Sequence, residues 1–307
     1  MKKIIVVLSF CFTSLFADKL NVTVSILPQK YFVEQIAKDK IDINVMVKPG
    51  FSPATYEPQT SQMKILSGSQ VYFSIGVPFE TVWLEKFENS NKSMKVIDTS
   101  KGISKLEMAE HEHHEESGHE EDHENEKHED NHEEKHDEDH DSEHNAGLDP
   151  HIWLDPLLVK IQAKNIYDTL VQLDTKNAAF YEKNYLEFLN NLDKLDKEIA
   201  STLKSVSEGA FMVFHPSWGY FAKRYNLEQI VVEKEGKEPK PKEIVELIEE
   251  SKKHNIKVVF VSPQFSQKAA KTIARSIKGK VVTIDHLDYD YPRGMINTAK
   301  AINNSYK

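Results

Sequence analysis

The sequence has a single cysteine among its 307 residues, and that cysteine, Cys11, lies close to the N-terminus. Two lysines precede a largely apolar run at residues 4–16, which ends before Ala17. This order is typical of a cleavable secretory signal peptide, so we expect residues 1–17 to be removed on export to the periplasm. The mature protein would then lack thiols, which excludes disulfides and thiolate metal ligands. Any bound metal would be held by imidazole, carboxylate or water.

Long hydrophobic runs and a strong positive charge are also absent. No later segment has eighteen consecutive apolar residues, so we expect no membrane anchor in the mature protein. The net charge of −10 comes from residues 110–145, which we call the histidine-rich tract. The tract contains 18 acidic residues, 2 lysines and 10 of the 14 histidines, and removing its −16 leaves +6 on the other 271 residues. That charge is too small to indicate a nucleic-acid-binding protein.

Hydrophobic periodicity changes repeatedly between that of strands and that of helices. In the N-terminal part, alternating or continuously apolar runs predict strands at residues 20–27, 41–47, 71–75 and 95–98. In the C-terminal part, similar runs predict strands at residues 211–214, 258–261 and 281–284. Helical spacing separates most of these runs. Strands that alternate with helices predict an α/β fold with parallel sheets flanked by helices.

The middle of the chain has a different pattern. Residues 176–204 contain no glycine or proline, and apolar side chains recur there every three or four residues. We therefore predict two α/β lobes, each with a mainly parallel sheet, joined by one long rigid helix. The expected divisions are an N-terminal lobe at residues 18–150 that includes the tract, a helical region at 151–205 and a C-terminal lobe at 206–307.

Three apolar runs of the C-terminal part end in polar residues, namely His215, Ser262 and Asp285. In open parallel sheets, ligands bind outside the carboxyl ends of the strands, so His215 and Asp285 are candidates for a binding site. The alternative is a helix cap, which is the common role of a single polar residue at such a place.

Four segments carry a resemblance to a known family. They are Pro-Gly-Phe-Ser-Pro-Ala-Thr-Tyr-Glu-Pro at 49–58, Asp-Pro-His-Ile-Trp-Leu-Asp-Pro at 149–156, Phe-His-Pro-Ser-Trp-Gly-Tyr-Phe at 214–221, and Pro-Gln-Phe-Ser at 263–266 followed by Ile284 and Asp285. With these segments the chain resembles the metal-binding class of solute-binding proteins of ABC transporters, and among them the zinc-binding receptors. The resemblance implies one Zn²⁺ in a cleft between the lobes, with His151, His215 and Asp285 as ligands.

The resemblance also leaves the fourth ligand open. The family normally supplies a histidine where this chain has Ala54, and alanine cannot bind a metal. Zinc prefers four ligands, so the remaining position would be filled by water, Glu57, Tyr56 or a histidine of the tract. His286 follows Asp285 directly, and strand alternation would turn its side chain the other way, into a polar wall.

The histidine-rich tract has its own candidate metal ligands. Five of its histidines are spaced by four residues, so that neighbouring pairs could chelate weakly bound zinc: His128, His132, His136, His140 and His144. The tract has no apolar residue to bury, and we expect it to be disordered without metal. Three matches to the metalloprotease pattern H-E-x-x-H occur in it. Such matches arise by chance in this composition, and we do not interpret them as catalytic.

The sequence therefore predicts a non-enzymatic, high-affinity periplasmic zinc receptor. It would act as a monomer and pass Zn²⁺ to an ABC transporter membrane permease with its cytoplasmic ATPase. Alternatives are a manganese or iron receptor of the same class, a periplasmic zinc hydrolase and a zinc buffer that acts through the tract. A hydrolase would need a general base and a substrate site beside the metal, and the sequence offers no convincing pair of groups for them.

Overall fold

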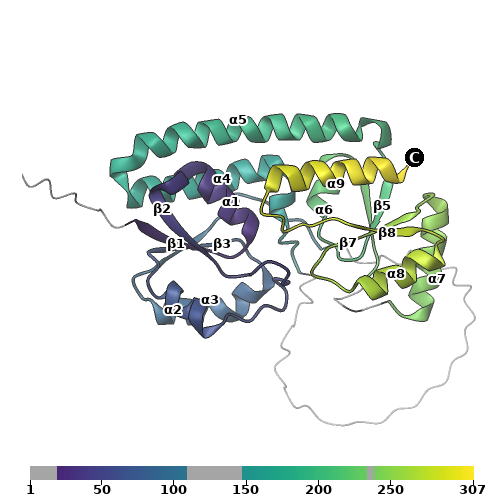
Figure 1. Cartoon of the computed structure of the whole chain (residues 1–307), viewed down its shortest axis with the longest axis horizontal. Helices are drawn as coiled ribbons and strands as arrows, with labels where there is room; N and C mark the ends of the chain where they lie inside the picture. Colours follow the sequence, from purple (N-terminus) through teal and green to yellow (C-terminus); the bar gives the residue numbers. More distant parts are fainter. Residues whose placement is uncertain (1–18, 109–146, 234–236, 238) are drawn as a thin grey trace, which may run out of the picture.

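The computed structural model describes residues 19–108, 147–233, 237 and 239–307. The predictions for the signal peptide and for the histidine-rich tract lie outside the described residues. Figure 1 shows two lobes side by side, with one long helix running over both of them. None of the helices in the described ranges combines the length and the apolar character needed to cross a bilayer.

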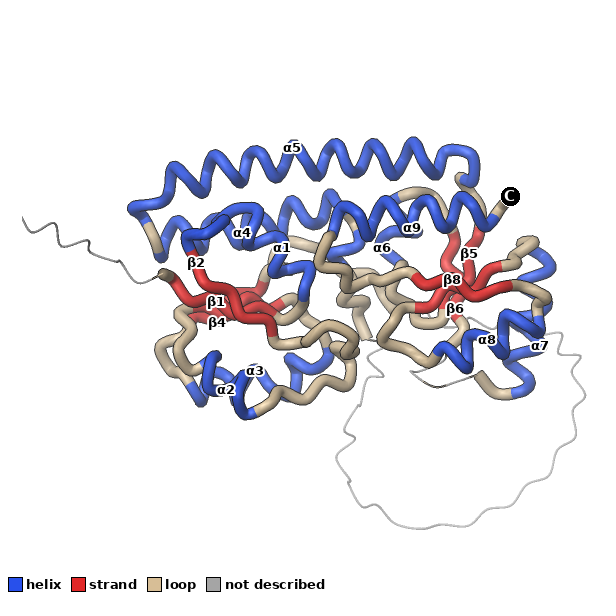
Figure 2. The backbone as a smooth tube through the Cα atoms, viewed as in Figure 1, coloured by secondary structure: helices blue, strands red, loops and turns tan. Residues whose placement is uncertain are grey.

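The first lobe contains a parallel sheet with strand order β2-β1-β3-β4. Its strands are β1 (Leu20–Val24), β2 (Ile41–Val45), β3 (Val71–Ser74) and β4 (Lys95–Asp98). Its helices are α1 (Leu27–Ala37), α2 (Thr60–Leu66) and α3 (Pro78–Ser90). Helices α2 and α3 cover one face of the sheet, and α1 lies on the other face (Figure 2). The two inner strands are largely buried, β1 from Val22 to Val24 and β3 over its whole length, as expected for a parallel sheet covered on both faces.

The second lobe repeats this topology with strand order β6-β5-β7-β8, again all parallel. Its strands are β5 (Ala210–Val213), β6 (Glu228–Val231), β7 (Val258–Val261) and β8 (Lys280–Thr283). Its helices are α6 (Gly219–Arg224), α7 (Pro241–Lys253), α8 (Gln267–Ser276) and α9 (Tyr291–Ser305). Helices α7 and α8 lie on one side of the sheet, and α9 lies on the other (Figure 1).

Two helices connect the lobes, α4 (Pro156–Leu173) and α5 (Ala178–Leu203). Helix α5 has 26 residues, which corresponds to about 39 Å at the usual rise per residue. It packs against α4, against α1 of the first lobe and against α9 of the second lobe. Its buried stripe follows the predicted helical spacing and includes Phe188, Leu192, Leu195 and Ile199. The predicted fold, two parallel α/β lobes joined by a long helix, is confirmed.

One hydrophobic cluster extends from the first lobe through α4 and α5 into the second lobe. At its centre, the Phe32 ring of α1 lies 6.0 Å from the Phe188 ring of α5 and 5.0 Å from the Tyr291 ring of α9, measured between ring centres. A smaller cluster lies between the second sheet and the helices α7 and α8. Because a shared core joins the lobes, large hinge motions would break buried contacts, and this favours a stiff arrangement.

Candidate metal centre

His151 lies at the junction of the two lobes and is held by the residues around it. The Asp149 N–H donates to the Leu106 carbonyl oxygen at 2.7 Å, which anchors the segment before the histidine. Asp149 Oδ1 then accepts both from the His151 backbone N–H at 2.8 Å and from its ring Nδ1 at 2.7 Å. Both side chains are buried. The ring therefore has a fixed orientation, with Nδ1 bound to a carboxylate.

His215 follows β5, two residues after the strand ends at Val213. Its Nδ1 is hydrogen-bonded to Oε1 of Glu233, which follows β6. Its ring stacks on Phe265, with 4.4 Å between the ring centres. Burial lowers the pKa of His215 below its usual value, and the hydrogen bond that the ring donates to Glu233 only partly opposes this effect. The neutral imidazole is thus favoured, and it is the form that binds metals.

The rings of His151 and His215 lie 5.4 Å apart, measured between their centres. In each ring Nδ1 faces a carboxylate, which accepts a hydrogen bond from Nδ1–H, so the lone pair of the neutral ring lies on Nε2. Metal-binding histidines commonly have this arrangement, in which an outer acceptor fixes the tautomer and the other nitrogen binds the ion. The sequence analysis did not identify Asp149 and Glu233 as these acceptors. For Asp149 the sequence did contain an indication, because this residue lies only two positions before His151.

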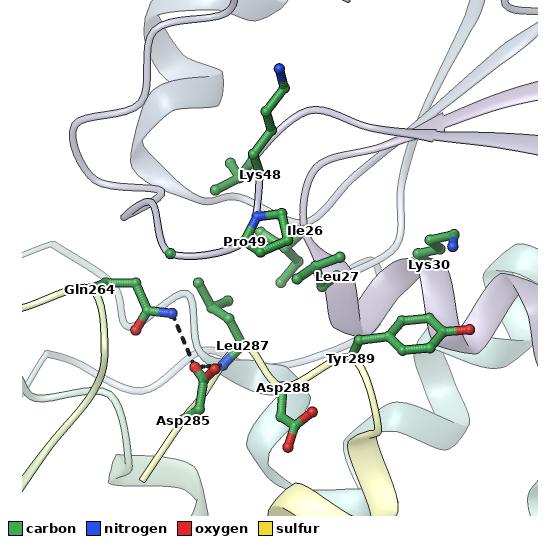
Figure 3. Close-up of a pocket in the computed structure, with 12 residues that line it drawn as sticks. Ile26, Leu27, Lys30, Lys48, Pro49, Gln264, Asp285, Leu287, Asp288 and Tyr289 are labelled. Atoms are coloured by element: carbon green, nitrogen blue, oxygen red, sulfur yellow. Dashed lines mark hydrogen bonds between the residues drawn. The ribbon is translucent and has the colours of Figure 1, made fainter. Parts of the chain in front are cut away.

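Asp285 lies two residues after the end of β8 and lines a cavity between the lobes. Its Oδ1 accepts from the Gln264 side-chain amide at 3.0 Å and from the Leu287 N–H at 2.9 Å (Figure 3). The cavity has a volume of about 410 Å³, and its lining from the first lobe includes Lys48 and Pro49. The first and second lobes thus both border the space next to this carboxylate.

His286 lies close to both predicted histidine ligands. Its ring centre is 5.6 Å from that of His151 and 6.1 Å from that of His215. Its Nδ1 lies 2.9 Å from Ser262 Oγ, and its carbonyl oxygen accepts from Trp153 Nε1 at 2.6 Å. Burial lowers the pKa of His286 well below its usual value, and the two neighbouring histidines lower it further. The sequence analysis had assigned this residue to a polar wall.

The candidates for the fourth ligand lie on the loop before α2. Ala54 and Glu57 are exposed, whereas Tyr56 is buried and donates its hydroxyl to Gln62 Oε1 at 2.7 Å. Within the described residues, no hydrogen bond or ring contact connects this loop to the three histidines. Nor does any group of three His, Cys, Asp or Glu side chains in these ranges already have the geometry of a metal site. The predicted ligand set therefore remains a prediction.

Comparisons with known proteins identify the family. A family model described as the periplasmic component A of the zinc-uptake complex, ZnuA, matches residues 22–305. The chain belongs to the ZnuA family. Among curated relatives, a high-affinity zinc uptake system protein ZnuA from Brucella abortus (strain 2308) is 33% identical over 313 residues, which cover 95% of this chain and 93% of the relative. ZnuA from Bacillus subtilis (strain 168) is 31% identical over 275 residues, covering 88% of this chain and 79% of the relative.

Solved structures of the ZnuA family have the same fold. A crystal structure of ZnuA has a TM-score of 0.81 and 37% sequence identity, and the match covers 94% of this chain and all of the other. A zinc-bound deletion variant of ZnuA has a TM-score of 0.79 and 38% identity, with 94% and 98% of the two chains covered. The resemblance to zinc-binding receptors of ABC transporters, first drawn from four short segments, is therefore confirmed at the level of the family.

Proposed function

We propose that this ZnuA-family protein is the high-affinity periplasmic zinc receptor of an ABC importer, which captures Zn²⁺ between its lobes and delivers it to the membrane permease and its cytoplasmic ATPase. The observation that carries the proposal is the pair of histidine rings 5.4 Å apart, each with Nδ1 bound to a buried carboxylate. The relatives named above are zinc uptake proteins, and one related structure contains zinc, which supports the same ligand.

The proposed ligands are Nε2 of His151, Nε2 of His215 and the carboxylate of Asp285. Imidazole nitrogens suit zinc, whereas sites for manganese are richer in carboxylates and carbonyl oxygens. A donor set with at least two imidazoles therefore favours zinc over manganese. Glu57, Tyr56, water or a tract histidine remain the proposed sources of a further ligand, with Tyr56 the least accessible because its hydroxyl is bound to Gln62.

The histidine-rich tract would supply zinc to this site. Its described flanks are paired, because the Met108 N–H donates to the Gly147 carbonyl oxygen at 3.1 Å and Glu107 forms an antiparallel bridge with Leu148. The second flank is followed within four residues by His151. Ions bound weakly by the tract would thus be released close to the candidate site, where the local concentration would favour capture.

Chelator competition on the full-length protein, with less than one equivalent of Zn²⁺, tests this function. Under these conditions the tightest site fills first and the tract contributes little. We expect His215→Ala to weaken binding by more than about 100-fold, which exceeds the usual effect of losing an outer hydrogen-bond partner. The matched control is His254→Ala, because His254 caps the end of α7 and pairs with Glu250. Equal affinities in all three proteins would contradict the proposal.

A further inference from the structure

Only four histidines lie outside the histidine-rich tract, and three of them meet in space. His151 comes from the lobe junction, His215 from the end of β5 and His286 from the segment after β8. Their ring centres are separated by 5.4, 5.6 and 6.1 Å. Each histidine thus lies next to both of the others, although up to 135 residues separate them in the sequence (His151 to His286).

The spacing of the rings agrees with that of imidazoles around one zinc ion. With Zn–N bonds of about 2.0–2.1 Å in a tetrahedron, the centres of two bound imidazoles lie about 5 Å apart. The three observed separations are all within about 1 Å of that value, so small side-chain movements would bring three nitrogens onto one ion. In the described ranges no group of three such side chains already has the geometry of a metal site, so binding would require these movements.

The hydrogen bonds of the three rings follow one pattern. His151 Nδ1 is bound to Asp149, His215 Nδ1 to Glu233 and His286 Nδ1 to Ser262 Oγ. No hydrogen bond to Nε2 of these three rings is formed by the described residues. The described residues thus engage Nδ1 of each ring and leave Nε2 without a protein partner, as a metal-binding nitrogen requires.

We propose that His286 is a third imidazole ligand for the captured zinc ion, which it binds through Nε2 while Ser262 orients its ring. The inference rests on the proposed function, since it names a further ligand of the same site. His286 would supply in the second lobe the donor that Ala54 in the first-lobe loop cannot. Asp285 or water would then complete the tetrahedron.

The number of imidazoles on the metal can be counted with Co²⁺ as the probe. One equivalent of this paramagnetic ion, added to the full-length protein, shifts the Nδ1 protons of imidazoles bound through Nε2 far from all other proton signals. Protons held in buried hydrogen bonds exchange slowly, so we expect three such signals in the wild-type protein and two in His286→Ala. Ser262→Ala should displace only the third signal and weaken Zn²⁺ binding by about 10-fold.

The outcomes separate this inference from the proposed function. If His286 is a ligand, chelator competition will show a loss of Zn²⁺ affinity for His286→Ala comparable to that of His215→Ala. If only the inference is wrong, His215→Ala will lose affinity, His286→Ala will not, and the wild-type protein will show two shifted signals. If the proposed function is wrong, neither variant will differ from the wild type. If His286→Ala does not fold, the number of shifted signals in the wild-type protein and the effect of Ser262→Ala still distinguish these outcomes.

Discussion

The two lobes have the same strand order and the same parallel topology, but they use the polar groups at their strand ends differently. In the first lobe, Gln29 accepts from the Ser25 N–H at 3.0 Å and donates to Thr99 Oγ1 at 3.2 Å. Ser25 Oγ also bonds to Glu80, whose carboxylate accepts from the backbone N–H groups of Ile75 and Gly76. These strand-end groups are bound to one another, and none is a histidine.

In the second lobe, the equivalent positions carry His215 after the first strand of the lobe and Asp285 and His286 after the last. The hydrogen bonds of His215 and His286 with the described residues engage Nδ1 of each ring and not Nε2. The shared topology of the two lobes thus makes a binding site at the strand ends possible but does not by itself create one. Whether the site binds anything depends on which polar atoms the surrounding residues leave unpaired.

The largest expected effect that distinguishes the two lobes is the contribution of Glu80, in the first lobe, to the pH dependence of stability. Burial raises the pKa of Glu80 to about 7. The folded state therefore binds more protons than the unfolded state between pH 4.5 and 7, and the stability contributed by Glu80 is complete below pH 4.5 and lost as the pH rises through 7. From pH 5 to pH 8, the wild-type protein should lose about 2 to 3 kcal/mol more unfolding free energy than Glu80→Gln.

Urea unfolding of the two metal-free proteins at both pH values measures this difference. The lowered pKa values of His215 and His286 act in the opposite direction but are present in both proteins, so they cancel. Zn²⁺ affinity of the folded variant should equal that of the wild type. Parallel pH profiles for the two proteins would show that Glu80 is ionised throughout, and a changed Zn²⁺ affinity would link the first lobe's network to the site.

The next effect concerns the acceptor that orients His215. We expect Glu233→Gln to weaken Zn²⁺ binding roughly 10- to 100-fold, or about 1.4 to 2.7 kcal/mol, because the imidazole loses its charged partner. A matched control is Glu228→Gln, which changes the acid at the other end of β6, near His254 rather than His215. Chelator competition on both variants provides the measurement. Similar affinities for the two would show that Glu233 does not support the site.

The smallest expected effect concerns the segment that contains the histidine-rich tract. Because Met108 and Gly147 are already hydrogen-bonded, residues 109–146 can be replaced by a short Gly-Ser link without moving the flanks. The unfolding free energy of the metal-free protein should change by less than about 0.5 kcal/mol, as for surface changes away from structural features. Calorimetry should show fewer weakly bound Zn²⁺ ions. A large loss of stability would mean that the tract packs against the lobes.

The fold was predictable because its elements have strong local patterns. Strand β3 begins with three apolar or aromatic residues in a row, and α5 has a long amphipathic stripe with no glycine or proline. Strand β6 was not predicted. Its sequence, Glu-Gln-Ile-Val, has only two apolar residues, and its strand conformation depends on pairing with β5. Patterns of such short length are ambiguous until tertiary contacts select one conformation.

The candidate site was only partly predictable. Strand-end position indicated His215 and Asp285, and a family segment indicated His151. The ring contacts of His286 could not be read from the sequence, because its partners Ser262 and Trp153 lie 24 and 133 residues away. Asp285 lines the cavity between the lobes, as its strand-end position suggested, but alternation could not show that His286 lies next to the two predicted histidine ligands.

The most direct test of the central claim is a crystal structure of the full-length protein with one equivalent of Zn²⁺, with anomalous scattering measured at the zinc edge. The claim is that the second lobe's strand end, together with the lobe junction, holds the ion through imidazole nitrogens left unpaired by the fold. It predicts one strong anomalous peak within bonding distance of Nε2 of both His151 and His215. A single peak elsewhere, with these two rings unmoved and unbound, would contradict the account.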